Sequence, residues 1–127
     1  MTQLSSEECL ELLGSVTVGH VAVSIDALPA IRTVRFVLTP AHVVFKAGAN
    51  SRLRRAAKNA VVAFHADSCN EDRREGWCVL VQGLGDEVTD LADLAELRPQ
   101  LDLWAPEDEE AFLRVSLSHV TGEHVIW

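Results

Sequence analysis

The sequence reads Thr17-Val18-Gly19-His20-Val21-Ala22-Val23-Ser24-Ile25, followed by Asp26-Ala27-Leu28-Pro29. The first nine residues are rich in β-branched side chains, which favour strands, and the next four are typical of a turn. Two more β-rich segments, residues 30–38 and 42–46, follow with only Thr39-Pro40-Ala41 between them. Connections this short join antiparallel strands, because a parallel crossover needs a dozen or more residues. The region therefore predicts an antiparallel meander.

The rest of the chain predicts three more strands and two or three short helices. We expect the strands at residues 60–66, at 76–83 with a continuation toward Val88, and at 113–120, which residues 125–127 would extend. We expect helices over residues 5–14, from Asn50 or Ser51 onward, and over 90–97, with a polar loop at 67–75 and an irregular acidic stretch at 101–110. Six strands with so few helices predict a mainly β protein, a small antiparallel barrel.

Two of the predicted strands are apolar on both faces, at Val61 to Phe64 and at Val79 to Val81. A sheet with one face in water would alternate more cleanly between apolar and polar residues. The second apolar face must therefore meet a helix or another subunit. Because few helices are available, we predict a homodimer.

Length and composition restrict the class of protein. The chain has 127 residues, of which 48% are hydrophobic and 24% charged, as expected for one globular domain over residues 1–127. Apolar runs are too short to span a membrane, the start is acidic unlike a signal peptide, and three irregularly spaced cysteines favour a reducing compartment. The expected location is the cytoplasm. The net charge of −8 argues against general binding to nucleic acid or to an anionic membrane.

The charge is unevenly distributed along the chain. Nine of the eleven basic residues lie between Arg32 and Arg74, together with only three acidic residues. A basic segment in an acidic protein indicates a local anion site. The alternative interpretation is a solvated helix face that carries Arg52, Arg54, Arg55 and Lys58.

The segment Phe45-Lys46-Ala47-Gly48-Ala49-Asn50-Ser51-Arg52-Leu53 is the most informative for chemistry. A strand ends in a cation, a loop of small residues follows, and the next helix begins with a hydroxyl and another cation. Free amide groups at a helix start favour a phosphate, and Lys46 and Arg52 would add charged hydrogen bonds. The alternative is a capped helix with basic residues on its surface.

Other motifs of catalysis or metal binding are weak. The five histidines fall singly in the sequence, so we predict no metal site. Cys78 lies in an apolar strand, where a buried thiol is inert, and Gly83-Leu84-Gly85 lacks the third glycine of a dinucleotide fingerprint. We assign no catalytic residue.

From Leu4 to Val125, the order of these features resembles the pyridoxamine-5′-phosphate-oxidase-like flavin-binding split-barrel family, especially its short actinobacterial-type members. The segments that carry the resemblance are residues 5–13, 18–23, 33–36, 45–47, 50–53, 76–79, 104–106, 114–116 and 120–122. The resemblance covers nearly the whole chain, and it rests on the order and spacing of these motifs.

The resemblance implies a dimeric six-stranded split barrel that binds flavin mononucleotide (FMN) at each subunit interface. Thr33, Val34, Arg35 and Phe36 would line the isoalloxazine ring. The phosphate would be held by Lys46, Ser51 and Arg52, next to Ala47. Trp77 and Cys78 would approach from the partner subunit.

Several residues depart from the pattern of the family. Lys46 stands in place of Arg, Ala47 in place of a hydroxyl residue, Asn50 in place of Gly and Cys78 in place of Ser, while Arg35 and Phe36 replace Asn and Tyr. The expected function is a flavin- or deazaflavin-dependent oxidoreductase that acts on an unidentified small molecule. The alternative is a non-catalytic split-barrel module that binds flavin, haem or another anionic metabolite, or that has lost its cofactor.

Overall fold

The predicted meander is present in the structure, a computed structural model that describes residues 2–101 and 110–127. It consists of β2 (Val18–Ile25), β3 (Leu28–Leu38) and β4 (His42–Gly48). β2 pairs with β3 over its whole length, and β3 then continues past β2 and pairs with β4. The length of β3 lets one strand belong to two parts of the sheet.

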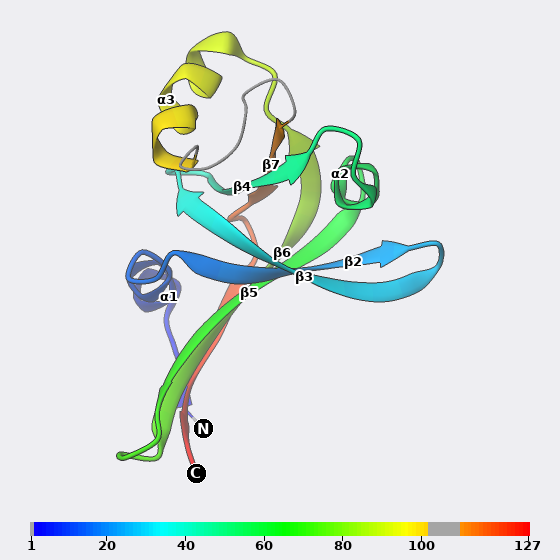
Figure 1. Cartoon of the computed structure of the whole chain (residues 1–127). Helices are drawn as coiled ribbons and strands as arrows, with labels where there is room; N and C mark the ends of the chain where they lie inside the picture. The colour runs from blue at the N-terminus through cyan, green and yellow to red at the C-terminus, as the bar shows by residue number, and fades with distance from the viewer. Residues whose placement is uncertain (1, 102–109) are drawn as a thin grey trace.

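Six antiparallel strands close into a barrel (Figure 1). The order is β6-β5-β2-β3-β4-β7, and β7 (Glu110–Ser116) pairs back to the end of β6 (Glu75–Glu87). The earlier part of β6 pairs with β5 (Val61–Asn70) on one side and with β8 (Val120–Ile126) on the other, and β8 lies outside the closed barrel. β1 (Thr2–Gln3) adds a short edge strand to β8. The predicted fold class, a mainly β protein with a six-stranded antiparallel split barrel, is confirmed.

Two secondary-structure predictions were wrong, one of a loop and one of a strand. The stretch 67–75 is mostly strand, because β5 runs to Asn70 and β6 begins at Glu75. Strand pairing uses backbone groups, so exposed polar side chains do not end it, and the resulting hairpin projects from the barrel in Figure 1. The predicted last strand, 113–120, is two strands separated by a turn at residues 117–119.

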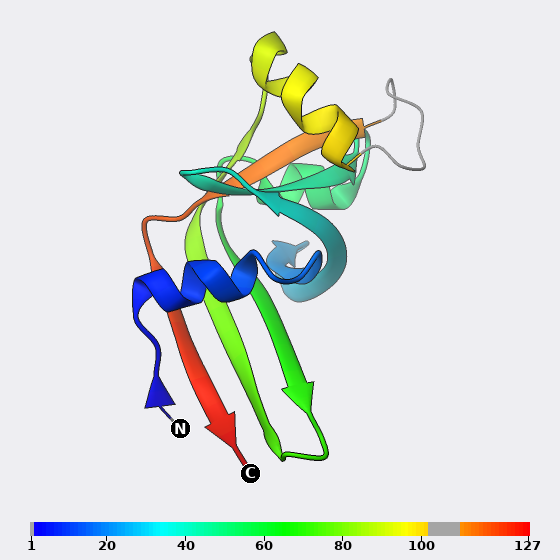
Figure 2. The ribbon, with the colours of Figure 1, turned by 90° about the vertical axis from the view of Figure 1, so that its left-hand side faces the viewer.

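Among the described residues, three helices pack outside the barrel. α1 (Ser6–Leu13) starts with a capping box formed by Ser5 and Glu8, and it lies across the sheet formed by β5, β6 and β8 (Figure 2). α2 (Arg52–Ala57) starts at the predicted cap, Ser51. α3 (Leu91–Leu101) is longer than predicted and contains Pro99, whose missing amide removes one hydrogen bond of the helix. Of the predicted acidic stretch, residues 102–109 lie outside the described residues.

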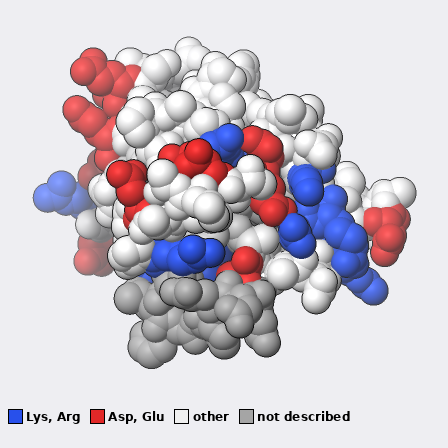
Figure 3. Space-filling model, turned by 90° about the horizontal axis from the view of Figure 1, so that it is seen from above, with Lys and Arg blue, Asp and Glu red and all other residues white. Residues whose placement is uncertain are grey.

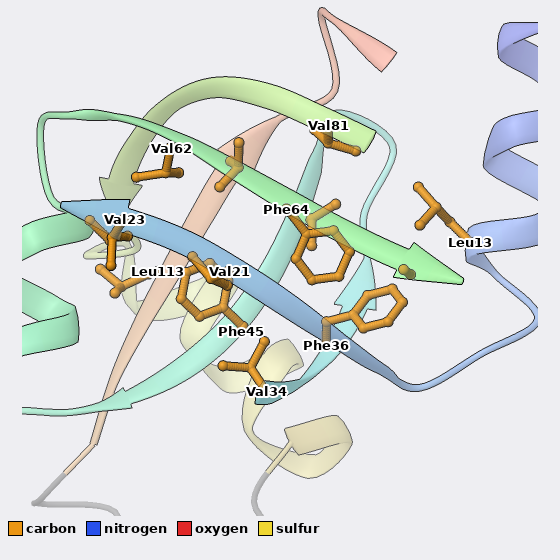
Figure 4. Close-up of a cluster of buried hydrophobic side chains, with 14 of the residues drawn as sticks. Leu13, Val21, Val23, Val34, Phe36, Phe45, Val62, Phe64, Val81 and Leu113 are labelled. Carbon is orange, nitrogen blue, oxygen red and sulfur yellow. The ribbon is translucent and has the colours of Figure 1, made fainter. Parts of the chain in front are cut away.

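The core fills the barrel interior with aliphatic and aromatic side chains (Figure 4). Phe36 and Phe64 meet edge to face, with their ring centroids 4.7 Å apart. A smaller cluster beneath α3 is formed by Val44, Val88, Leu97, Leu101 and Phe112. In the part of the chain that the structure describes, no helix is both long and apolar enough to span a membrane.

Candidate functional site

The loop between β4 and α2 is held in a tight conformation by its own residues. The Ser51 amide donates to the Gly48 carbonyl oxygen over 3.0 Å. The Ser51 hydroxyl oxygen accepts from the Arg54 amide over 3.1 Å, as expected of an N-cap. The local sequence therefore forms the predicted strand, small-residue loop and capped helix.

Two arginines of α2 fold back over this loop. Arg54 Nη1 donates to the Ala49 carbonyl oxygen over 2.6 Å, and Arg55 Nη1 donates to the Asn50 carbonyl oxygen over 3.0 Å. Three consecutive loop carbonyls, at residues 48–50, thus accept hydrogen bonds from the N-cap of α2 and from two arginines of the helix. The donors compensate the partial negative charge of these carbonyl oxygens. An anion near the loop would therefore meet less repulsion from them.

Arg54 also forms a two-pronged ion pair with Glu87 at the end of β6. The Nε–Oε1 and Nη2–Oε2 distances are 2.7 and 3.0 Å. The hydrogen bond from Arg54 lowers the pKa of Glu87 and, in turn, raises the pKa of Arg54. Arg54 therefore has a structural role, and the Arg54–Glu87 pair carries no net charge.

A basic recess of about 300 Å³ lies beside the loop, and we call it the α2 recess. It is lined by Ala49, Asn50, Arg54, Arg55 and Lys58. Figure 3 shows Lys and Arg gathered on the right-hand side of the molecule, the side that carries α2 in Figure 1. Arg54, Arg55 and Lys58 were not predicted as site residues, although the four cations of this short segment are visible in the sequence.

The side chain of Lys46 reaches the end of α3. Its Nζ donates to the Leu101 carbonyl oxygen over 3.5 Å and lies 3.9 Å from a carboxylate oxygen of Glu110. The sequence prediction grouped Lys46 with Ser51 and Arg52. In the structure, Ser51 and Arg52 stand together at the start of α2, whereas Lys46 contacts the end of α3 and the start of β7.

The predicted ring-lining stretch of β3 alternates between the core and the surface. Val34 and Phe36 are buried in the core, as is Ala47 on β4. Thr33 and Arg35 are exposed on the outer face of the sheet. A ligand along β3 would touch the side chains of Thr33 and Arg35, and only the backbone of the other two.

Trp77 and Cys78 point to opposite faces of β6. Trp77 packs against the main core, whereas Cys78 lines an outer hollow of about 230 Å³ together with His65, Leu80 and Glu123. β2 and β5 separate β6 from β3, which is three inter-strand spacings, or about 14 Å. Within one chain, Cys78 is therefore far from Thr33 and Arg35.

A hollow of about 420 Å³ lies beneath α3 and contains none of the predicted site residues. His42, Leu97 and Arg114 are among its lining residues. Burial and the positive charge of Arg114 lower the pKa of His42, which favours the neutral imidazole. Among the residues that the structure describes, no group of three His, Cys, Asp or Glu side chains is placed to hold a metal ion.

The chain matches one protein family over nearly its whole length. The family described as pyridoxamine 5′-phosphate oxidase matches residues 5–124. The uncharacterised protein Rv0080 of Mycobacterium tuberculosis is 30% identical over 131 residues, which cover 99% of this chain and 86% of that protein.

Solved structures share the fold. The FAD binding protein from Mycobacterium smegmatis is 34% identical to this chain, covers 100% of both chains and superimposes with a TM-score of 0.85. An FAD-binding protein from Mesorhizobium loti is 23% identical, with a TM-score of 0.77, and covers 96% of this chain and 94% of its own. The second likeness shows the fold alone, whereas the first extends to the sequence.

Proposed function

The chain belongs to the pyridoxamine 5′-phosphate oxidase family, and on that premise we propose that it binds a flavin and acts as a flavin-dependent oxidoreductase on a small molecule. The observation that carries the proposal is the likeness, over the full length of both chains, to the FAD binding protein from M. smegmatis. A shared fold alone would not be sufficient, because one fold serves many functions.

The residues around the β4–α2 loop fit the phosphate end of a flavin nucleotide. Ser51 and Arg52 stand at the start of α2, and the carbonyls of residues 48–50 already have hydrogen-bond donors. A phosphate at this point would meet donors and a cation instead of lone pairs. Thr33 and Arg35 remain the exposed candidates for contact with the ring system.

The flavin, when bound, would supply the redox chemistry, and the chain would bind and orient it. The exposed side chain of Arg35 would bring a positive charge to the ring, in place of the neutral residue of the family pattern. We assign no proton donor or acceptor.

The proposal includes a second copy of the chain, which would complete the flavin site. Within one chain, Thr33 and Arg35 lie three inter-strand spacings, about 14 Å along the sheet, from Cys78, which favours a partner as the source of the Cys78 that approaches the same ring. The outer face of β2, β3, β5 and β6 also exposes Ile31, Val61 and Leu84, at 67%, 78% and 56%. Apolar side chains grouped this way are typical of an interface between subunits. We propose a homodimer with the flavin at the interface.

The first experiment is a flavin titration of the purified protein after its absorption spectrum has been recorded. We expect bound flavin in the spectrum, or quenching of flavin fluorescence with a micromolar or lower Kd. A phosphorylated flavin should bind more tightly than riboflavin, because riboflavin lacks the phosphate. If no flavin and no deazaflavin binds, the proposed function is wrong.

A second measurement separates the enzyme from a flavin carrier. The flavin-loaded protein is mixed with a reduced nicotinamide or a reduced deazaflavin, and the flavin absorbance is followed over time with and without candidate acceptors. Steady turnover supports the oxidoreductase. Binding without any turnover supports the non-catalytic module.

A further inference from the structure

The hollow beneath α3 contains none of the residues proposed to bind flavin, and it has the size of a small-molecule site. Its volume is about 420 Å³, whereas ligand pockets usually measure between about 300 and 1,000 Å³. Val44, Val88 and Leu97 line it, and they are 1%, 4% and 5% exposed. The same residues belong to the cluster that holds α3 against the barrel. A ligand in the hollow would therefore lie on a preformed apolar wall.

His42 brings a polar group without a partner to the hollow. Its imidazole makes no hydrogen bond to any residue that the structure describes, whereas its backbone bonds to Thr39. Burial and the charge of Arg114 favour the neutral imidazole, because they lower its pKa. A neutral imidazole has one donor nitrogen and one acceptor nitrogen. A ligand that fills the hollow can therefore hydrogen-bond to His42.

The charged groups around the hollow leave an excess of negative charge. Arg114 lines it, but its Nε and Nη2 atoms donate to Asp86 Oδ2 over 3.2 and 3.0 Å, so this pair is neutral as a whole. Asp93 and Glu96 also line the hollow, and both are exposed at its rim on one face of α3. Figure 3 looks down on the end of the molecule that carries α3 in Figure 1, and acidic side chains are visible there.

These charges decide which ligand the hollow suits. Besides Arg114, Asp93 and Glu96, no charged residue is among the described residues that line it. Two carboxylates would attract a cation and repel an anion such as a nucleotide phosphate. The apolar wall requires that the rest of the ligand be apolar as well.

We propose that the hollow beneath α3 is a second ligand site, which binds a small organic amine by its apolar body and its ammonium group. The apolar body would lie on the buried wall, the ammonium group would face Asp93 and Glu96, and His42 would accept a hydrogen bond from the ligand. This inference does not rest on the proposed flavin binding, because the two sites share no residue.

The test titrates the purified protein with three compounds that share an indole ring and differ in charge. Tryptamine carries an ammonium group, tryptophol a hydroxyl group and indole-3-acetate a carboxylate. We expect tryptamine to bind at least about tenfold more tightly than indole-3-acetate in calorimetric titrations, with tryptophol between them. Tryptamine should shift the NMR signals of the His42 ring, and saturating FMN should not displace it.

The double variant Asp93→Asn, Glu96→Gln separates the charge from the shape of the site. It should bind tryptamine about fivefold more weakly, since an exposed ion pair contributes only a few-fold each, and its affinity for tryptophol should stay within about twofold. The matched control is Glu71→Gln, Asp72→Asn, which removes the same charge from the exposed turn between β5 and β6 and should leave tryptamine binding unchanged. The free energy of unfolding of both variants shows that each is folded.

The pH dependence of binding tests the role of His42. Tryptamine should bind more weakly as the pH falls from about 8 to about 5.5, because a protonated imidazole would repel the ammonium group. The charged groups that face His42 are Arg114, Asp86, Asp93 and Glu96. The variant His42→Asn should bind tryptamine with little change over the same range, because it has no imidazole to protonate.

Three outcomes would overturn the inference. Tryptamine does not bind at millimolar concentration, it binds no more tightly than indole-3-acetate, or its binding leaves the His42 signals unchanged. None of these results bears on the flavin titration, so the proposed function would stand. A protein that binds tryptamine but no flavin would keep this site while the proposed function fails.

Discussion

His42 lies in the hollow beneath α3, where two effects act on its imidazole in the same direction. Burial lowers its pKa first, the positive charge of Arg114 lowers it further, and Asp86 acts weakly in the opposite sense. We expect His42 to titrate below its ordinary value of 6.5 in an NMR pH titration. In Arg114→Gln the midpoint should rise, but stay below 6.5, because burial remains.

The lowered pKa of His42 also determines how its contribution to the stability of the protein changes with pH. Because the pKa is lower in the folded chain, the unfolded chain binds this proton first as the pH falls. The contribution of His42 to stability is therefore complete above pH 6.5 and is lost as the pH falls through its folded pKa. Arg73→Gln, far from the hollow, is the control and should not move the midpoint. A midpoint that is the same with and without Arg114 would contradict this account.

Glu87 shows the corresponding effect for an acid. Its hydrogen bonds from Arg54 hold its pKa below the ordinary 4.5, so its charged form favours the folded state. We expect Glu87→Gln to lower the melting temperature by several degrees at pH 7, because Arg54 would lose a charged partner. The difference from wild type should persist above pH 4.5 and shrink as the pH falls through the folded pKa of Glu87.

Denaturation midpoints of the two proteins, measured between pH 3 and 7, check the Glu87 prediction. Glu71→Gln is the control, since Glu71 is exposed in the turn between β5 and β6. A stability gap between wild type and Glu87→Gln that stays constant down to pH 3 would refute the ion pair as its cause.

At the scale of elements, α2 is held against β6 at Gly85. The Gly85 amide donates to the Ala60 carbonyl over 2.7 Å, and the Gly85 carbonyl accepts from the Asn59 amide over 2.8 Å. A Cβ atom at Gly85 would overlap the carbonyl oxygen of Ala57, a backbone atom that cannot rotate away. Glycine is needed here because two backbones approach each other closely.

We expect Gly85→Ala to destabilise the chain by about 3 kcal/mol, measured by urea denaturation. Because α2 must move, phosphorylated flavins should also bind more weakly. Gly14→Ala is the control, since its added Cβ would meet no atom closer than 3.5 Å and its φ is −67°. Equal stability of the two variants would show that the Gly85 contact is not tight.

The elements that could be predicted from the sequence are those with a local signal. The meander follows from β-branched runs and short turns, and the helix starts follow from Ser5 with Glu8 and from Ser51. The extension of β5 to Asn70 could not be predicted, because pairing by the backbone leaves no apolar pattern in the side chains. The turn at 117–119 carries neither Gly nor Pro, the usual turn residues.

The candidate site was predictable to a lesser degree. The position of Ser51 at the start of a basic helix has a local signal, but the ion pair of Arg54 does not, because Glu87 is 33 residues away. The alternation of β3 was visible in the sequence. It already implied that Val34 and Phe36 face the core when Thr33 and Arg35 face outward, and the family resemblance treated the four residues as one stretch.

At the scale of the whole molecule, one surface is basic and another is apolar. The basic side at α2 suits an anion, and the outer face of the sheet exposes apolar residues of four neighbouring strands. Val61 and Leu84 lie directly opposite each other on β5 and β6, and Ile31 and Ala63 both pair with Ala22. A second copy that covers this face would remove these side chains from water.

We expect the wild-type chain to sediment as a dimer, and the variant Val61→Asp, Leu84→Asp to sediment as a monomer. Two carboxylates on the face would have to be buried without partners, which strongly disfavours association. Both residues are more than half exposed in the single chain, so the monomer should stay folded. Leu91→Asp is the control, because Leu91 is 80% exposed but lies on α3, away from this face.

The same variant tests where the flavin binds. If one flavin contacts both subunits, the monomeric variant must bind flavin more weakly than the wild-type dimer. A variant that is monomeric but binds flavin as tightly as wild type would place the whole site within one chain.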